Sequence, residues 1–187
     1  MSKEYKKYSD FELVNLLRTE KPKANLAFAE LYNRHSSMLH AYCYKIIGDE
    51  DAAEDIFQES FIKFYQNVSN ELPNSNIPGF LVKIARNLCL NYKRDKRPTV
   101  PIEDLDFIFQ DSQNYEQKEL LDLITRSLDL VEDDYKEAFI LREYSGLSYD
   151  EIAEACNISL SNAKSRVFRA KQKLKSILQP YLKDLKA

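Results

Sequence analysis

Two long stretches of this chain contain almost no residue that interrupts a helix. The six prolines stand at 22, 73, 78, 98, 101 and 180. Glycine accounts for 3 of 187 residues, against roughly 7% in average proteins. Gly48 is the one glycine between Pro22 and Pro73, and Gly146 is the one glycine between Pro101 and Pro180. Long segments without such breakers favour helices. The sequence therefore predicts an all-α fold.

Charge is segregated along the chain, although the total is close to balance. The chain has 27 Lys and Arg and 30 Asp and Glu, a net charge of -3, which excludes a uniformly basic nucleic-acid coat. Residues 1–97 carry +2, residues 98–117 carry -5, residues 118–154 carry -7 and residues 155–187 carry +7. Such segregation is typical of a protein with one surface for a polyanion and others that avoid one.

The stretch 98–117 separates two helical parts. It contains two prolines, five acids without a base and no sustained helical period, so we predict a flexible acidic linker between domains at 1–97 and 118–187. The longest uncharged stretch is residues 72–82, which is far shorter than the roughly 20 apolar residues of a membrane span. No apolar core follows the N-terminal lysines, so no secretion signal is indicated. We expect a cytoplasmic protein without membrane insertion.

The cysteines favour neither disulfides nor a metal site. Cys43, Cys89 and Cys156 are odd in number, far apart and have apolar neighbours. No CxxC pair occurs, and His35 and His40 are five residues apart, which places them off one helix face. We therefore predict buried free thiols, and no cofactor.

The segment 148–174 has the pattern of a helix-turn-helix. Ser148 and Glu151 form a capping box, which predicts a helix start. Asn157 tolerates positive φ in the short turn, and Ser159 can cap the helix that follows. The second helix has an apolar stripe with helical spacing, made of Ala163, Val167, Ala170, Leu174 and Ile177.

The opposite face of that second helix carries short polar side chains followed by cations. Its members are Ser161, Asn162, Lys164, Ser165, Arg166, Arg169 and Lys173. This order suits a helix that enters the major groove by its N-terminus. A solvated basic face would explain the charges alone, but their coincidence with two capped helices favours DNA binding. Phe168 points outward, either as a groove contact or as a residue without a partner.

A second basic surface lies on the helix that begins at Ile77-Pro78-Gly79. One face carries Lys83, Arg86, Asn87, Lys93, Arg94 and Arg97, which is typical of a surface that follows phosphates. Phe80 and Asn91 border this face, one able to stack on an unpaired base and the other able to read a base edge. A solvated face is the alternative. It explains less well why Asp95, the only acid of the helix, lies elsewhere.

An acidic helix precedes the basic one. Six of the eleven residues at 49–59 are acids, and Asp51 with Glu54 is expected to form a capping box after Gly48. The outward residues are Asp51, Glu54, Asp55, Gln58 and Glu59, with Ile62 among them. The helix macrodipole accounts for acids in the first turn but not for Glu59 or Ile62. We predict a docking face for a basic partner. A two-metal hydrolytic site is the alternative. The spacing of the acids argues against it, because they follow the helix surface and do not converge on a cavity.

These elements, in this order, resemble the extracytoplasmic-function (ECF) sigma factors of the sigma-70 family. The residues that carry the resemblance are AFAELYNRH at 27–35, GDEDAAEDIFQESFIKFY at 48–65, GFLVKIARNLCLNYKR at 79–94, AFILREYSGLSYDEIAEACNIS at 138–159 and AKSRVFRAKQKL at 163–174. The resemblance covers nearly the whole chain. It implies a region 2 domain at 1–97, a linker at 98–117 and a region 4 domain at 118–187, without the middle domain of larger sigma factors.

The resemblance also implies a role for each surface. Residues 51–65 would bind the clamp helices of the largest polymerase subunit, residues 80–97 would hold the opened −10 strand, and the loop 68–77 would capture a flipped −10 base. Residues 161–169 would read the −35 element, and the linker would run toward the RNA exit path. The implied function is that of a non-catalytic initiation factor for core RNA polymerase and promoter DNA, with an anti-sigma factor as a further candidate partner.

Three positions depart from the common pattern of that family. Phe64-Tyr65 replaces a frequent tryptophan, Asn91 stands where an acid is frequent, and Asn157 replaces the usual turn glycine. Two other functions stay open at this point. A helix-turn-helix activator would need a sensor or dimerisation domain, where residues 1–97 offer a basic helix. A metal-dependent nuclease would use the acids at 49–59 and would cleave DNA with magnesium alone.

Overall fold

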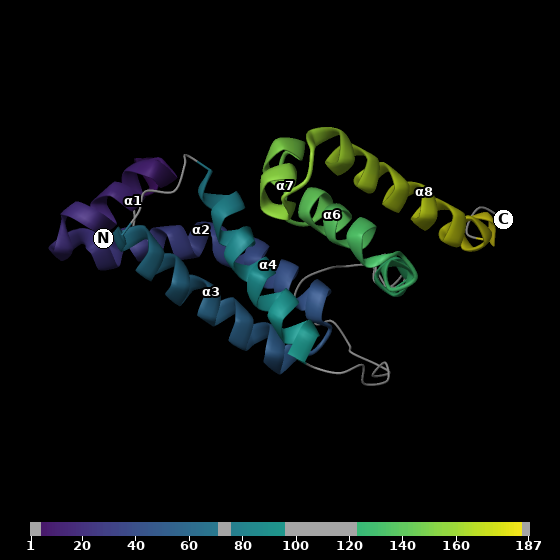
Figure 1. Ribbon diagram of the computed structural model, residues 1–187, viewed down its shortest axis with the longest axis horizontal. Helices are drawn as coiled ribbons and strands as arrows, with labels where there is room; N and C mark the ends of the chain where they lie inside the picture. Colours follow the sequence, from purple (N-terminus) through teal and green to yellow (C-terminus); the bar gives the residue numbers. More distant parts are fainter. Residues whose placement is uncertain (1–4, 71–75, 96–122, 185–187) are drawn as a thin grey trace.

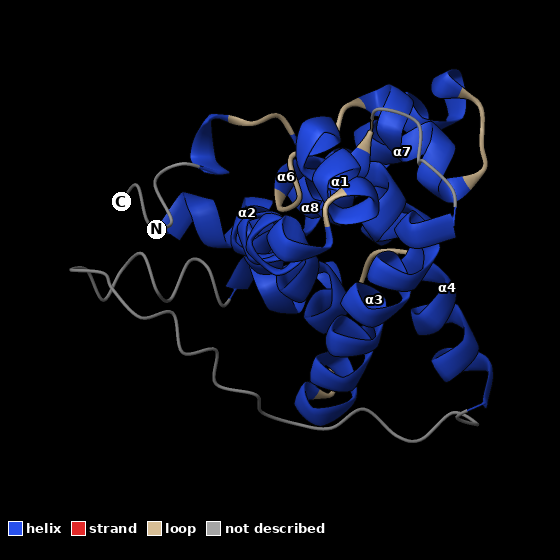
Figure 2. Cartoon of the chain, turned by 90° about the vertical axis from the view of Figure 1, so that its left-hand side faces the viewer, coloured by secondary structure: helices blue, strands red, loops and turns tan. Residues whose placement is uncertain are grey.

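The structure is a computed structural model that describes residues 5–70, 76–95 and 123–184, and every regular element within these ranges is a helix (Figure 2). The 3-10 turn η1 (Tyr5–Lys7) precedes α1 (Asp10–Thr19), α2 (Lys21–Ile47), α3 (Glu50–Asn70) and α4 (Ile77–Asp95). A short helix at 123–128 is followed by α6 (Asp133–Glu143), α7 (Tyr149–Cys156) and α8 (Leu160–Asp184). The predicted all-α fold is confirmed. The predicted linker at 98–117, Arg97 and residues 71–75 of the predicted 68–77 loop lie outside the described residues.

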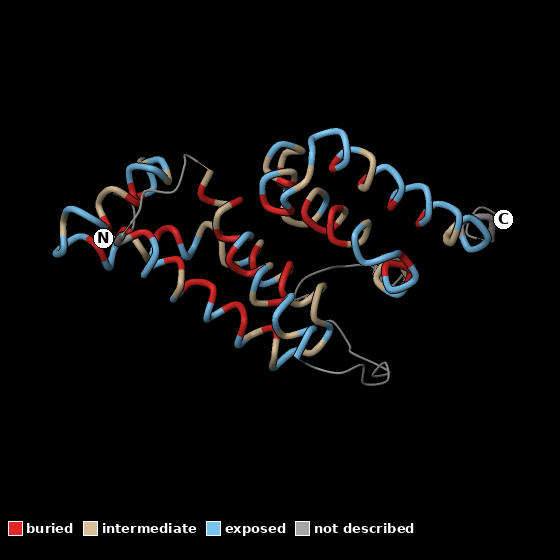
Figure 3. The backbone as a smooth tube through the Cα atoms, in the orientation of Figure 1, coloured by how far each residue is buried: buried red, intermediate tan, exposed pale blue. Residues whose placement is uncertain are grey.

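Helices α1 to α4 form the first unit of the molecule (Figure 1). Its core is made where α2, α3 and α4 meet, and Leu31, Phe64 and Leu81 are fully buried there. Figure 3 shows buried residues along the inner sides of these helices and exposed residues along their outer sides. Each helix therefore buries one stripe and leaves an outer face free to carry function.

Local capping sets where the helices of this unit begin and end. Gly48 ends α2 with φ of 73°, as predicted. The predicted Asp51–Glu54 capping box is wrong, because the backbone N–H of Ala52 donates instead to Asp49 Oδ1 at 2.9 Å. The left-handed Gly48 places the helix start one residue after Asp49, so Asp51 already lies inside the first turn. Asn76 caps α4 in the same way, accepting from the N–H of Gly79 at 2.9 Å.

Helices α6, α7 and α8 form the second unit, and α7 and α8 are the predicted helix-turn-helix. The Ser148–Glu151 capping box is confirmed, with both of its hydrogen bonds present. Asn157 takes φ of 54° in the turn, and Ser159 Oγ accepts from the N–H of Asn162 at 3.2 Å. Ala163 and Val167 of α8 are buried as predicted.

The two units are in contact. Helix α4 packs against α7 and α2 packs against α6, and α4 lies on the side of the first unit that faces α6 and α7 (Figure 1). One cluster of buried apolar residues runs through both, including Ala85 and Cys89 of α4 and Ile152 and Cys156 of α7. A continuous core of this kind holds the units together through the hydrophobic effect.

The three cysteines are buried free thiols, as predicted. A hydrogen bond with the Cys89 thiol, together with burial, raises the pKa of Cys43. Burial raises the pKa of Cys156 to about 12. The thiols of Cys43 and Cys156 are therefore protonated at neutral pH and unreactive as nucleophiles. In the part of the chain that the structure describes, no helix has the length and apolar content needed to cross a bilayer.

Candidate nucleic-acid interface

The basic face of α4 is largely exposed to solvent. Lys83, Asn87, Asn91, Lys93 and Arg94 are all exposed. Arg94 pairs with Asp95 at 3.2 Å and Lys93 pairs with Asp133 of α6 at 3.6 Å. Contacts between such exposed side chains contribute little to stability and exchange readily with other partners. The face thus presents a row of cations and two amides.

Phe80 lies deeper than the rest of this face. Its side chain is half-buried and belongs to the apolar residues that pack on the core. The ring centroids of Phe80 and Phe64 are 6.1 Å apart, with the rings tilted by 57°. Phe80 therefore has a structural role in the first unit, and the part of its ring that is accessible is smaller than the helical period suggested.

Arg86 does not point freely to solvent. Its Nε donates to Glu137 Oε1 at 3.0 Å, its Nη2 donates to Glu137 Oε2 at 3.2 Å, and its side chain is 19% exposed. Burial lowers the pKa of Arg86, but the charge and hydrogen bonds of Glu137 raise it more, so the net shift is upward. Arg86 is thus a fixed cation held by α6. The helical period of α4 contains no information about this partner, which is 51 residues away.

The outer face of α8 carries both exposed side chains and side chains that are held by α6. Ser161, Asn162 and Lys164 are exposed, Ser165 is half-buried, and Phe168 is 62% exposed. Phe168 therefore points outward, as expected.

The two arginines of this face are held by α6. Arg166 Nη2 donates to Asp134 Oδ2 at 2.6 Å, which leaves the Arg166 side chain 16% exposed. Arg169 is exposed and donates from Nη1 to the hydroxyl of Tyr135 at 2.8 Å. Asp134 and Tyr135 thus orient both guanidinium groups, and the predicted contact of Arg166 with DNA requires its ion pair with Asp134 to exchange.

The acidic face of α3 is exposed over three turns. Asp51, Asp55, Gln58 and Glu59 are exposed, and Ile62 is 57% exposed. Glu54 is half-buried, pairs with His40 at 3.4 Å and accepts from Gln58 Nε2 at 2.7 Å. Among the described residues, no three His, Cys, Asp or Glu side chains come close enough to hold a metal ion. The carboxylates thus follow the helix surface, which does not favour the two-metal nuclease.

Two exposed aromatic residues extend this face beyond the predicted set. Tyr65 of α3 is 40% exposed and Tyr32 of α2 is 39% exposed. Their rings stack edge-on or tilted against Phe28 and Phe61, at centroid distances of 5.4 and 4.8 Å. The sequence contains an indication of Tyr65, because a residue three positions after Ile62 lies on the same side of the helix. Aromatic residues beside charges are typical of the core of a protein interface.

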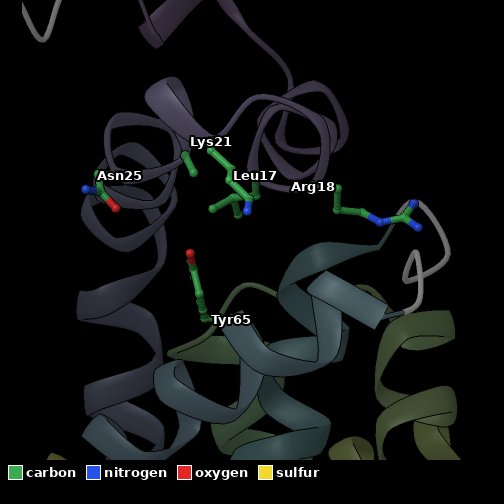
Figure 4. Close-up of a pocket in the computed structure, with 6 residues that line it drawn as sticks. Leu17, Arg18, Lys21, Asn25 and Tyr65 are labelled. Atoms are coloured by element: carbon green, nitrogen blue, oxygen red, sulfur yellow. The ribbon is translucent and has the colours of Figure 1, made fainter.

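A cavity of about 390 Å³ lies beside the same helix. It is lined by Leu17, Arg18, Lys21, Ala24, Asn25 and Tyr65. Tyr65 rises from α3 toward Leu17 and Lys21, whereas the guanidinium group of Arg18 extends away from them (Figure 4). No carboxylate, histidine or thiol is among the six lining residues, so the cavity does not assemble an acid–base or nucleophilic site.

The geometry defines a two-unit helical protein whose separate outer faces suit nucleic acid and a basic protein partner. Comparison with known proteins identifies the family to which such a protein belongs. Residues 31–99 match the family described as sigma-70 region 2, and residues 121–174 match the family described as sigma-70, region 4.

Several curated relatives agree along most of their length. The ECF RNA polymerase sigma factor EcfG of Rhodopseudomonas palustris is 33% identical over 75% of this chain and 78% of its own. The RNA polymerase sigma-H factor of Pseudomonas aeruginosa is 30% identical over 84% of this chain and 89% of its own. The ECF RNA polymerase sigma factor SigM of Bacillus subtilis is 29% identical over 83% of this chain and 97% of its own.

Two solved structures share the fold. CnrH, solved with the cytosolic domain of CnrY, has a TM-score of 0.70 at 19% identity and covers 91% of this chain and 97% of its own. The sigma factor RpoE of Bartonella quintana, solved with the anti-sigma factor NepR, has a TM-score of 0.66 at 24% identity. The match covers 81% of this chain and 96% of the Bartonella chain. The chain belongs to the ECF sigma factors of the sigma-70 family. Its function is to direct RNA polymerase to promoters and to initiate transcription.

Proposed function

We propose that each of the three exposed faces binds one component of the initiation complex. In this assignment the acidic face of α3 binds core polymerase, the basic face of α4 binds the separated −10 strand, and the outer face of α8 binds the −35 element. The residue sets are those predicted from the sequence, with domain limits at 1–97 and 118–187 and the linker at 98–117. The observation that carries the proposal is that these faces lie on three different helices.

Core docking through α3 follows from the combination of charge and apolar surface. Asp55 and Glu59 are exposed beside Ile62, and Tyr32 and Tyr65 add aromatic area. Charge complementarity speeds association and fixes orientation, while the apolar centre supplies the affinity. A basic, partly apolar helical surface on the polymerase is the complementary partner.

The two DNA faces differ in the kind of DNA that they suit. On α8, Ser161, Asn162 and Lys164 stand at the start of a helix, where they can reach base edges and phosphates in the major groove. On α4, Asn87 and Asn91 offer amides among cations along one helix face. A separated strand presents Watson–Crick edges that a closed duplex does not. Promoter opening is therefore assigned to α4.

Three further parts of the proposal concern the protein as a whole. It acts as a binding factor without catalysis of its own, in the cytoplasm, where RNA polymerase works. CnrH and the Bartonella sigma factor were each solved with a bound partner, and NepR is named as an anti-sigma factor. By this likeness an anti-sigma factor is proposed as a partner of this chain too.

Reversal of charge on α3 tests core docking. The double variant Asp55→Lys/Glu59→Lys should weaken binding to purified core polymerase at least about tenfold, because two attractive charge contacts become repulsive. The helix content should not change, since both side chains point to solvent. Affinity is measured by fluorescence anisotropy of labelled protein with core enzyme.

The matched control is Glu132→Lys/Glu154→Lys, which makes the same change of net charge at exposed positions of the second unit. The control should retain at least most of the wild-type affinity. Equal affinity of the α3 variant and the wild type for core polymerase would remove α3 from the interface.

A further inference from the structure

A buried polar cluster joins the two units of the molecule. Glu137 of α6 is 8% exposed and accepts hydrogen bonds from three other helices. The hydroxyl of Tyr42 donates to its Oε1 at 2.9 Å, Arg86 donates from Nε and Nη2 at 3.0 and 3.2 Å, and the Cys156 thiol lies 3.8 Å from its Oε2. We call Tyr42, Arg86 and Glu137 the interdomain latch, because two of them belong to the first unit and one to the second.

The latch uses a cation from the face proposed to bind the −10 strand. Two parallel hydrogen bonds between a guanidinium and a carboxylate have the same form as those between a guanidinium and a phosphate. Glu137 therefore offers Arg86 a substitute for the phosphate of a nucleic acid. Asp133, one turn earlier on α6, lies 3.6 Å from Lys93, a second cation of the same face. The contact between α6 and α4 thus covers part of a DNA-binding surface with carboxylates.

We propose that Glu137 competes with DNA for Arg86, so that the second unit inhibits strand binding by the first until the interdomain latch separates. This proposal rests on the function proposed above for α4. In this arrangement Nε and Nη2 of Arg86 donate to Glu137, so a phosphate cannot accept from the same two groups at the same time. Binding of the −10 strand then requires that α6 and α4 move apart.

The latch lies buried between the two units, so breaking it should favour their separation. The Arg86 and Glu137 side chains are 19% and 10% exposed, so salt screens their attraction less than that of a surface pair. Loss of one partner leaves a charge buried without compensation, which favours separation of the units. A strand-binding form that is populated at about one part in ten weakens the apparent affinity for DNA about tenfold, and removal of the latch restores it.

The variant Glu137→Gln tests this in the full-length protein. It keeps the size of the side chain but removes the charge that holds Arg86. We expect its radius of gyration in small-angle X-ray scattering to exceed that of the wild type by several ångströms. We also expect its affinity for a fluorescein-labelled, 20-nucleotide single-stranded DNA of mixed sequence to rise about tenfold at fixed salt, without polymerase present. The milder variant Tyr42→Phe should shift both quantities in the same direction.

The matched control is Glu132→Gln, which makes the same charge change at an exposed position of the second unit, five residues before Glu137. It should leave the radius of gyration unchanged and raise DNA affinity by less than about twofold. In a second arm, Arg86→Gln combined with Glu137→Gln should lose the gain in DNA affinity while staying expanded. Circular dichroism checks that each variant keeps its helix content.

Two results would overturn the proposal. If both Glu137→Gln and Tyr42→Phe keep wild-type dimensions and wild-type DNA affinity, the latch does not control the domains. If the protein expands without any gain in strand binding, Glu137 does not compete with DNA. Run-off transcription by the wild type with core polymerase is measured separately. A run-off transcript that depends on the wild-type protein shows that it acts as a sigma factor, even if the latch does not control DNA binding.

Discussion

Individual side chains on the two faces proposed to bind DNA differ in how exposed they are and in the partners that hold them. Asn87 is exposed on α4, whereas Arg86, its neighbour in sequence, is held by Glu137. Phe80 is half-buried against Phe64, so its replacement by alanine also removes packing in the first unit. Replacement of the exposed Asn87 therefore tests strand binding without removing packing from the first unit.

Asn87→Ala should bind a closed promoter normally with core polymerase but open it poorly. An amide that contacts an unpaired base edge is worth about 1–3 kcal/mol, and no such edge is available before the strands separate. Opening is measured by permanganate reactivity of unpaired thymines at the −10 element. The defect should diminish on a template that is already mismatched there.

Lys164→Ala on α8 is the comparison for Asn87→Ala. Lys164 is exposed near the start of α8, the helix proposed to bind the −35 element, so its loss should weaken closed-complex binding and should not be rescued by the mismatch. Wild-type permanganate reactivity of Asn87→Ala on the fully paired template would show that Asn87 does not hold the strand.

At the scale of single elements, the N-terminal segment is fixed to α2 by one charged network. Asp10 of α1 contacts Arg34 at 2.9 Å and His35 at 2.6 Å. Arg34 also pairs with Glu30 at 2.9 Å and donates to backbone carbonyls of η1. The hydrogen bond from His35, with Arg34 and against the effect of burial, lowers the pKa of Asp10 from its ordinary 3.8.

The lowered pKa of Asp10 predicts a pH dependence of stability. A carboxyl group whose pKa is lower in the folded state stabilises the fold fully above its unfolded pKa, and the contribution is lost as the pH falls through the folded pKa. Asp10→Asn should therefore lower the free energy of unfolding by about 1–2 kcal/mol at pH 5–7. The difference from the wild type should shrink below about pH 4.

Urea unfolding at several pH values, followed by circular dichroism, measures this difference. Asp55→Asn is the control, because it removes an equivalent charge from an exposed position of α3. A difference between Asp10→Asn and the wild type that stays constant down to pH 3 would contradict the role of the Asp10 charge.

How much of each element the sequence predicts depends on the range of the interactions that define it. The helix-turn-helix was predictable because Ser148, Glu151 and Asn157 act within four residues of their own positions. The start of α3 was misplaced by two residues, since Asp49 and Asp51 are both good caps and only the backbone decides between them. The partners of Arg86 and Arg166 were not predictable, because each lies more than 30 residues away and depends on packing between helices.

At the scale of the whole molecule, helix α6 contacts both faces that are proposed to bind DNA. Glu137 and Asp133 pair with cations of α4, and Asp134 pairs with Arg166 of α8. The segment 118–154, which carries a net charge of -7, thus includes carboxylates that occupy the basic surfaces of the protein itself. We expect the isolated chain to bind DNA weakly and the complex with polymerase to bind it specifically.

Transcription from a pool of genomic fragments tests the central claim most directly. Purified core polymerase transcribes the pool with and without this protein, and sequencing of RNA 5′ ends maps the start sites. The account predicts a discrete set of start sites that depend on the protein and share two upstream elements, near −10 and −35. The same start sites with and without the protein would contradict its function as a sigma factor.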